Sequence, residues 1–171
     1  MVQESKAKQS CRIRAAHFGD YETVSDIAGD VFAAYGDYSE VLPGYMFFDN
    51  VQTFVCEVED RIVGFIQLGF VPDAAQGGRV VADVLAVGLL DGYRHMGLGR
   101  ALFQRVFDEM EQVGPARGLF DLWLTVAHTN RPAIEAFTRL GFTFHGEAVG
   151  IYEGGQRALR MRRPIEQGGD S

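Results

Sequence analysis

The stretch Tyr93-Arg94-His95-Met96-Gly97-Leu98-Gly99-Arg100-Ala101-Leu102 decides how the rest of the chain is interpreted. It follows an apolar run, residues 80–90, that predicts a buried strand. From Leu98 onward, apolar residues recur with the spacing of a helix. Gly97 and Gly99 therefore stand where a strand is followed by a helix. Glycine lets the backbone approach a ligand, and the unpaired first amides of a helix attract anions. The stretch predicts a site for a phosphate or pyrophosphate group.

Three known phosphate-binding patterns compete for this turn. A P-loop requires Lys-Ser/Thr after its last glycine, and Arg100-Ala101 stand there instead, which excludes it. A Rossmann turn requires a further glycine where Leu102 stands, and an acid about 20 residues on. Asp121 lies near that distance but begins its apolar run instead of ending it, so a nucleotide-binding regulatory domain is a weaker alternative. The third pattern, Arg/Gln-x-x-Gly-x-Gly/Ala, is matched by residues 94–99.

Composition limits the classes of protein to consider. With 171 residues, 47% of them apolar, the chain can form one domain with a proper core. No apolar run reaches the ~18 residues of a membrane span, and the first ten residues are polar, so we expect neither membrane insertion nor export. Cys11 and Cys56 do not make a disulfide framework, which favours buried thiols and a cytoplasmic location. A net charge of −7 argues against nucleic-acid binding.

The order of expected elements is β-α-(α)-β-β-β-α-β-α-β-β, which predicts a mixed α/β sheet. We expect loose tails at 1–10 and 166–171 around one domain, 11–165. Strands are expected at 11–15, 53–58, 62–70, 80–90, 119–127, 142–150 and 157–163. Asp20 should cap the first helix, Gly114-Pro115 should end the helix that starts at Leu98, and Thr129-Asn130 should cap a helix that ends at Gly141. The aromatic segment 36–50 is expected to cover a core edge or to form the wall of an acceptor-substrate pocket.

A second pattern lies in the C-terminal half. Leu124 to Ile134 and then Leu140-Gly141-Phe142 match L-x-V-x-x-x-N-x-x-A-I…G-F. Together with the pattern at 94–99, in the same order and context, it makes residues 12–164 resemble the GNAT superfamily of acetyl-CoA-dependent N-acetyltransferases. The resemblance implies a mostly antiparallel sheet, flanked by helices and splayed between its fourth and fifth strands. Acetyl-CoA would lie in that splay, and no metal is expected.

The resemblance also implies contacts with the cosubstrate. The backbone of residues 89–91 would bond the pantetheine arm, and the amides of residues 96–100 would hold the pyrophosphate. Asn130 would touch the cofactor from the next helix, and Phe137 would pack near its thiol end. The implied cofactor-binding residues are Leu89, Leu90, Asp91, Arg94, His95, Met96, Gly97, Leu98, Gly99, Arg100, Asn130 and Phe137.

Direct transfer of an acetyl group to an amine requires a base, because the amine is protonated at neutral pH. Asp83 lies eleven residues before Arg94, a spacing at which the histone acetyltransferase branch carries a glutamate base. If Asp83 faces the splay beside Leu85 and Val87, burial raises its pKa into a useful range. The alternative is a structural acid. Glu57 and His145 are weaker candidates for the base.

One departure from the family pattern concerns the acid. Many members carry a tyrosine seven residues past the asparagine, where it protonates the leaving thiolate; this chain has Phe137. Tyr152, or an ordered water, is the expected substitute. We therefore predict an N-acetyltransferase that acts on a primary amine of a small molecule or peptide, as a monomer or a small homo-oligomer such as a homodimer. The alternative is an acyl-CoA-binding sensor or a catalytically idle module of the same fold.

Overall fold

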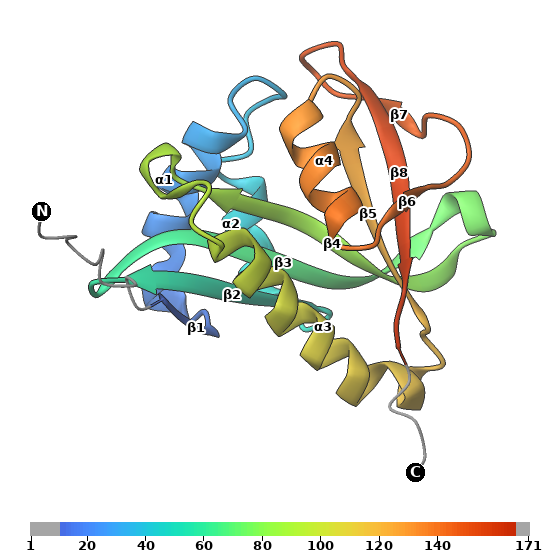
Figure 1. The fold of residues 1–171 in the computed structure, drawn as a ribbon, viewed down its shortest axis with the longest axis horizontal. Helices are drawn as coiled ribbons and strands as arrows, with labels where there is room; N and C mark the ends of the chain where they lie inside the picture. Colours follow the sequence, from blue (N-terminus) through green and yellow to red (C-terminus); the bar gives the residue numbers. More distant parts are fainter. Residues whose placement is uncertain (1–10, 167–171) are drawn as a thin grey trace, which may run out of the picture.

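The computed structural model describes residues 11–166, and all strands of this part belong to one sheet (Figure 1). The strand order is β1-β2-β3-β4-β5-β8-β6, with β7 also paired to β8. The strands are β1 (Cys11–Ala15), β2 (Val51–Val58), β3 (Arg61–Asp73), β4 (Arg79–Leu89), β5 (Asp121–Ala127), β6 (Thr143–Phe144), β7 (Gly150–Ile151) and β8 (Arg157–Pro164). The helices are α1 (Tyr21–Val31), α2 (Val41–Gly44), α3 (Leu98–Arg117) and α4 (Arg131–Arg139). The predicted tails lie outside the described residues, except for Glu166.

Neighbouring strands are antiparallel everywhere except between β4 and β5, which are parallel. These two strands pair only over residues 82–84 and 122–124. Beyond that point residues 85–89 of β4 and 125–127 of β5 do not pair with each other. The mixed, mostly antiparallel sheet expected from the sequence is confirmed, and its splay opens just after Val84 and Leu124.

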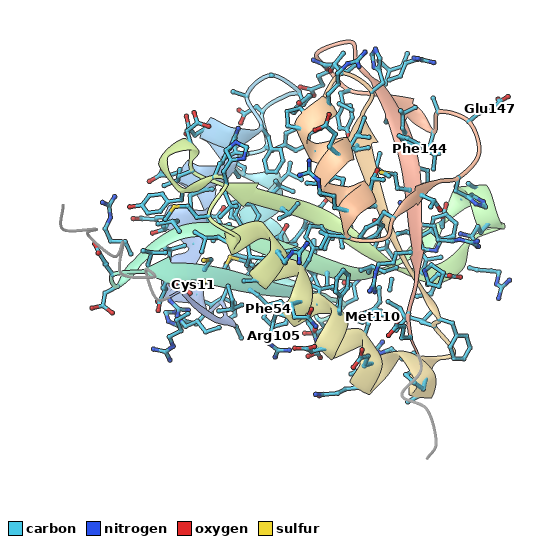
Figure 2. The ribbon with its side chains drawn as sticks, in the orientation of Figure 1. Cys11, Phe54, Arg105, Met110, Phe144 and Glu147 are labelled. Carbon is cyan, nitrogen blue, oxygen red and sulfur yellow. The ribbon has the colours of Figure 1, made fainter. Side chains whose placement is uncertain are left out.

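The helices cover both faces of the sheet. Figure 1 shows α3 crossing the front of the sheet with α4 beside it, while α1 lies behind. Under α3 a large apolar core forms, and Arg105 of α3 also lays its guanidinium 4.5 Å from the centre of the Phe54 ring (Figure 2). Phe137 of α4 joins this core through Phe103, at 5.6 Å between ring centres. A smaller cluster around Val24, Ile27 and Phe65 buries α1 on the opposite face.

The sequence predicted that helix α3 ends at Gly114-Pro115, and this prediction is wrong. The helix continues to Arg117 and ends at Gly118, which has a left-handed backbone (φ 68°). The amide of Gly118 bonds to the Pro115 carbonyl, and that of Leu119 to the Gly114 carbonyl. Proline has no N–H to donate, but its carbonyl can still accept a hydrogen bond, so proline is tolerated in the last turn of a helix. The glycine that follows then ends the helix.

Two further element boundaries differ from expectation. The strand expected at 142–150 is two short strands, β6 and β7, each paired to β8 and separated by residues 145–149. Asp20 precedes α1, but its carboxylate makes no capping bond. It instead accepts both terminal nitrogens of Arg14, at 2.7 and 3.0 Å, and the His17 amide at 2.9 Å. A charged partner outcompetes the backbone amides of the helix.

Candidate active site

The turn before α3 leaves a row of backbone amides without partners. Gly97 is the N-cap of α3 and has a left-handed backbone (φ 80°). Within residues 11–166, the six consecutive N–H groups of residues 95–100 have no hydrogen-bond acceptor. Arg94 closes the preceding turn, because its Nε donates to the Leu89 carbonyl at 3.4 Å and its NH1 lies 3.2 Å from Asp91. The free amides and the positive end of the α3 dipole make this turn a site for an anion.

The two glycines of the turn have different reasons to be glycine. Gly97 requires its positive φ, which a side chain tolerates poorly. Gly99 has an ordinary helical backbone, so a side chain there would cause no backbone strain. A Cβ at Gly99 would meet only a Leu89 methyl at 3.6 Å, an ordinary contact. The space in front of Gly99 is therefore open, and what a side chain would obstruct is a ligand.

This space belongs to a cleft of about 500 Å³, here called the loop cleft. Its walls are the turn before α3, the end of β4, α4 and the end of α1. The cationic side chains that line it are Arg94, Arg100 and Arg139, and its apolar floor includes Val87 and Phe103. Cations and free amides at one end, with an apolar floor, fit a molecule that has a phosphorylated head and a slender tail.

Three predicted cofactor-binding residues, Leu90, Asp91 and Met96, do not line the loop cleft. Leu90 packs with the cluster under α1, while Asp91 and Met96 are exposed. Any contact that these residues make with the cofactor would have to come from their backbone, which for residues 89–91 is what the sequence predicted. The remaining predicted residues line it: Leu89, Arg94, His95, Gly97, Leu98, Gly99, Arg100, Asn130 and Phe137.

A narrower space of about 140 Å³, the splay cavity, lies where β4 and β5 part. It shares Tyr35, Asn130 and Phe137 with the loop cleft, so the two spaces adjoin. The Asn130 Oδ1 accepts the Ala133 amide at 3.3 Å, which confirms the predicted cap of α4 and fixes this side chain at the junction. A slender molecule entering along the loop cleft would reach the splay cavity with its far end.

Different parts of the aromatic segment 36–50 have different environments. Tyr38 and Tyr45 pack against the smaller core cluster under α1, as expected for residues that cover a core edge. Tyr38 and Leu42 also line the splay cavity, and that this lining receives the acceptor stays a prediction. Phe47 and Phe48 are more than half exposed, and Phe47 stacks on Phe18 with ring centres 5.0 Å apart. Only the first half of the segment therefore contributes to the site.

Tyr152 lies in the wall of the splay cavity, at the turn between β7 and β8. Its hydroxyl has no hydrogen-bond partner among the described residues. Burial, with smaller effects from Tyr38, Tyr35 and Asp83, raises the pKa of Tyr152 to about 12. The phenol therefore keeps its proton at neutral pH and can act as a donor, which Phe137 in the same cavity cannot do.

Asp83 sits one pair before β4 and β5 part, opposite Trp123. Asp83 does not line the splay cavity, although the sequence led us to expect it to face the splay, and its Oδ2 accepts a hydrogen bond from Arg160 NH1 at 2.9 Å. Burial nonetheless raises the pKa of Asp83 to about 6, although the charge and hydrogen bond of Arg160 oppose the shift. Asp83 lines a separate space of about 530 Å³, the Asp83 pocket, and Thr125 lines both this pocket and the splay cavity.

The two weaker candidates for the base lie elsewhere. Glu57 accepts Arg14 Nε at 2.8 Å, next to the Arg14–Asp20 pair at the β1 edge of the sheet. The imidazole of His145 packs edge-on against Trp123, 4.9 Å between ring centres. Neither residue lines the loop cleft or the splay cavity.

Sequence reasoning missed Arg160 and Asp73, which hold Asp83 in place. Arg160 is 8% exposed, and its NH2 donates to Asp73 Oδ2 at 3.0 Å. No local signal in the sequence indicated this, because Arg160 alternates with the apolar Leu159 and Met161, a pattern that predicts an arginine on the exposed face of the strand. The partners lie 77 and 87 residues away in the chain, so no local pattern indicates them.

Among residues 11–166, no cluster of three or more His, Cys, Asp or Glu side chains has an arrangement suited to a metal ion. No helix in this part of the chain combines the length and the apolar character needed to cross a bilayer.

Comparison with known proteins agrees with this geometry. The model of the acetyltransferase (GNAT) family matches residues 20–142. An N-alpha-acetyltransferase of Sulfurisphaera tokodaii is 29% identical over 95% of this chain and 98% of its own. A streptothricin acetyltransferase of Streptomyces lavendulae is 39% identical over 66% of this chain, which spans 58% of that protein.

Solved structures share the fold. The crystal structure of the ribosomal-protein-S18-alanine N-acetyltransferase from Escherichia coli superposes with a TM-score of 0.75 at 24% identity, over 95% of this chain and 98% of that one. Arabidopsis thaliana NAA60 in complex with acetyl-CoA gives a TM-score of 0.76 at 18% identity, over 91% and 99% of the two chains. At these identities the likeness concerns the fold.

Proposed function

The chain belongs to the GNAT family of acetyltransferases and transfers an acetyl group to an amine, and from this premise we propose that acetyl-CoA is the donor, bound in the loop cleft. The observation that carries the proposal is the row of six free amides, residues 95–100, at the head of a cleft that leads to the splay cavity. The alternative of a sensor or an idle module is not favoured, because the similar proteins are named as acetyltransferases.

We assign the holding of the cosubstrate to three groups of residues. The amides of residues 95–100 would bind its pyrophosphate, with Arg100 and Arg139 supplying further positive charge. Val87 and Leu89 would line the path of the pantetheine arm, and Phe137 would pack near its thiol end. When bound, the cosubstrate supplies an acetyl group activated as a thioester.

The acceptor amine must lose a proton before or during attack. We propose Asp83 as the group that takes this proton. Its pocket shares the lining residue Thr125 with the splay cavity, and only one of its oxygens, Oδ2, accepts a hydrogen bond from Arg160. A pKa of about 6 leaves the carboxylate mostly ionised at neutral pH and still able to bind a proton during the reaction.

On the side of the thioester, we propose that Tyr152 donates a hydrogen bond to the leaving sulfur. Its free hydroxyl lies in the wall of the splay cavity, which also contains Phe137. Because the pKa of Tyr152 is raised to about 12, its phenol gives up the proton less readily than an ordinary tyrosine. The hydroxyl can still donate a hydrogen bond. The thiolate would then leave with a donated hydrogen bond instead of a full proton transfer.

For the acceptor we propose the α-amine of a polypeptide. The support is the N-alpha-acetyltransferase that matches nearly the whole chain at 29% identity. A second candidate is a streptothricin-like antibiotic, because the streptothricin acetyltransferase has the higher identity, 39%, over a shorter part of the chain. We also propose a reducing compartment such as the cytoplasm, since a chain with only two cysteines, Cys11 and Cys56, has no disulfide framework.

An amine panel tests these proposals. Thiol release from acetyl-CoA is measured with short peptides of varied first residue, with the same peptides blocked at the N-terminus, with streptothricin and with free lysine. We expect turnover on unblocked peptides and none on blocked ones. Turnover confined to streptothricin would move the acceptor to the second candidate. Absence of thiol release with every amine, in protein that binds acetyl-CoA, would overturn the assignment as a peptide or antibiotic acetyltransferase.

A further inference from the structure

Arg160 is a buried cation divided between two carboxylates. From β8, its NH1 donates to Asp83 at 2.9 Å and to Thr125 Oγ1 at 3.3 Å, while its NH2 donates to Asp73 at 3.0 Å. Its guanidinium carbon lies 5.0 Å from the centre of the Trp123 ring. The three charged side chains are 8–15% exposed. A guanidinium fixed on several sides cannot turn away from either acid.

The two carboxylates share the cation unequally. Besides Arg160, Asp73 accepts the amide of Ala75 at 2.9 Å and the side chain of Gln76 at 3.3 Å. Burial acts to raise the pKa of Asp73, but the hydrogen bonds from Arg160 and Ala75 bring it below its ordinary value. Asp83 has no donor except Arg160 among the described residues, so burial prevails there. Asp73 is therefore the permanent counter-ion of Arg160, and Asp83 is the acid that can exchange a proton.

We propose that Asp73 and Arg160 are positioning residues for proton transfer: Asp73 competes with Asp83 for one guanidinium, so that Arg160 orients Asp83 without holding it permanently ionised. The inference rests on the proposed role of Asp83 as proton acceptor. Arg160 alone beside Asp83 would make a tight pair, in which the carboxylate is a poor base. Burial is the main cause of the raised pKa of Asp83, and the negative charge of Asp73, which neutralises the same cation, acts in the same direction. Asp83 thus keeps its orientation and remains basic.

Other titratable groups near Asp83 do not replace this control. Glu147, in the loop between β6 and β7, lines the Asp83 pocket, but Figure 2 shows its side chain pointing outward from the molecule. The pKa of Tyr152 is raised to about 12, so its phenol keeps its proton and is neutral near neutral pH. His145 and Arg162 pack near Trp123, and neither bonds to Asp83 within the described residues. Among the described residues, Arg160 is therefore the charged group in direct contact with Asp83, and Asp73 acts on Asp83 through Arg160.

The test is the pH dependence of kcat/KM in Asp73→Asn. Asparagine can still accept from Arg160, so the geometry is conserved while the competing charge is lost. Asp83 then keeps the whole cation, and we expect the acidic limb of the profile to move down by roughly one pH unit. The affinity for acetyl-CoA should stay unchanged. Asp108→Asn on the exposed face of α3 is the control, because it makes the same change in net charge away from the site.

Two further variants separate the outcomes. Asp83→Asn tests the proposed function: if it keeps the acidic limb of the wild type, Asp83 is not the base. If Asp83→Asn loses the limb but Asp73→Asn leaves it where it was, the present inference alone is overturned. Arg160→Gln, if it folds, should move the limb upward, opposite to Asp73→Asn. A shift of the same sign in both variants would indicate a merely structural disturbance and would overturn the inference.

Discussion

The ring of Tyr152 lies 5.5 Å from the ring of Tyr35, so two segments 117 residues apart meet at the splay cavity. Backbone contacts reinforce the meeting: the Gly154 amide donates to the Tyr35 carbonyl at 3.3 Å, and the Gln156 side chain donates to the Ala34 carbonyl at 3.0 Å. The segment after α1 and the hairpin between β7 and β8 thus form a clamp, residues 34–38 against 152–156. The clamp holds both tyrosines at the cavity.

Gly154 allows the clamp to close, because a Cβ there would overlap the carbonyl oxygen of Ala34. We expect Gly154→Ala to push the two segments apart and to raise KM for the amine by about tenfold, the scale of a small misplacement in a positioned site. Affinity for acetyl-CoA should change little. Gly150→Ala is the matched control, since a Cβ at Gly150 meets nothing within 4 Å. Equal steady-state constants in the two variants would contradict the role of the clamp.

Tyr152→Phe removes the hydroxyl and keeps the ring that contacts Tyr35. We expect kcat to fall by about 10²-fold, the low end for loss of a group that acts on the reacting atoms, with KM for the amine nearly unchanged. Steady-state kinetics at saturating acetyl-CoA measures this. Since the pKa of Tyr152 is raised to about 12, the wild-type rate should show no loss from its ionisation below pH 10. A variant as fast as the wild type would mean that the thiolate leaves without help from this residue.

The turn before α3 could be predicted from the sequence because its determinants are local. Gly97 needs its own backbone angle, and the helix that follows has its own apolar spacing. Element ends were less predictable where two local rules conflict. Pro115 signals a stop, yet Gly118 three residues later offers a better one, and Asp20 signals a cap until Arg14 binds its carboxylate.

Asp83 was predicted from the sequence as the candidate base, but the residues around it could not be predicted. Its burial follows from an apolar strand, which local spacing indicates. Its partner Arg160 depends on the pairing of β5 with β8, in which Thr125 lies opposite Arg160. Such a register is fixed by the whole sheet and not by any segment of it. The clamp residues are equally non-local, which explains why only one of the two tyrosines, Tyr152, was foreseen.

Coenzyme A should compete with acetyl-CoA for the loop cleft, and NAD should not. The Arg/Gln-x-x-Gly-x-Gly/Ala turn is followed by Arg100, and Arg139 also lines the cleft, so a 3′-phosphate adds a charge that NAD lacks. Arg131, another cation near the start of α4, does not line the cleft. Thermal shift at equal ligand concentrations measures the difference. Greater protection by NAD than by coenzyme A would place this turn among nucleotide-binding sites of another kind.

Gly99→Val should weaken acetyl-CoA binding by well over tenfold while leaving the fold intact. The protein itself has room for a Cβ, which would meet only Leu89 at 3.6 Å, so the loss would come from the obstructed ligand. Calorimetry measures the affinity, and circular dichroism the fold. Gly92→Val is a useful comparison, because Gly92 precedes the turn and has nothing within 4 Å of its Cβ position, yet it does not line the cleft. Unchanged affinity in Gly99→Val would remove the pyrophosphate from this turn.

Asp83→Asn should lower turnover by about 10²-fold and leave acetyl-CoA affinity within a few-fold. The wild-type rate should fall as pH drops through about 6, where Asp83 takes up its proton, and the variant should lack this limb. A near-normal rate with the same limb would make Asp83 structural. The base would then have to be sought at Glu57, at His145 or in a water.

The same substitution should stabilise the protein at neutral pH. The pKa of Asp83 is raised from 3.8 to about 6 on folding, so the folded state binds this proton more tightly than the unfolded state. The contribution of Asp83 to stability is therefore fully present below pH 3.8 and is lost as pH rises through 6. Asparagine stays neutral, and Arg160 keeps Asp73 as its counter-ion. We expect Asp83→Asn to gain on the order of 2 kcal/mol at pH 7.5 and nothing near pH 4. Urea unfolding at both pH values measures the difference, and a variant less stable at pH 7.5 would show that Arg160 holds Asp83 more tightly than burial opposes it.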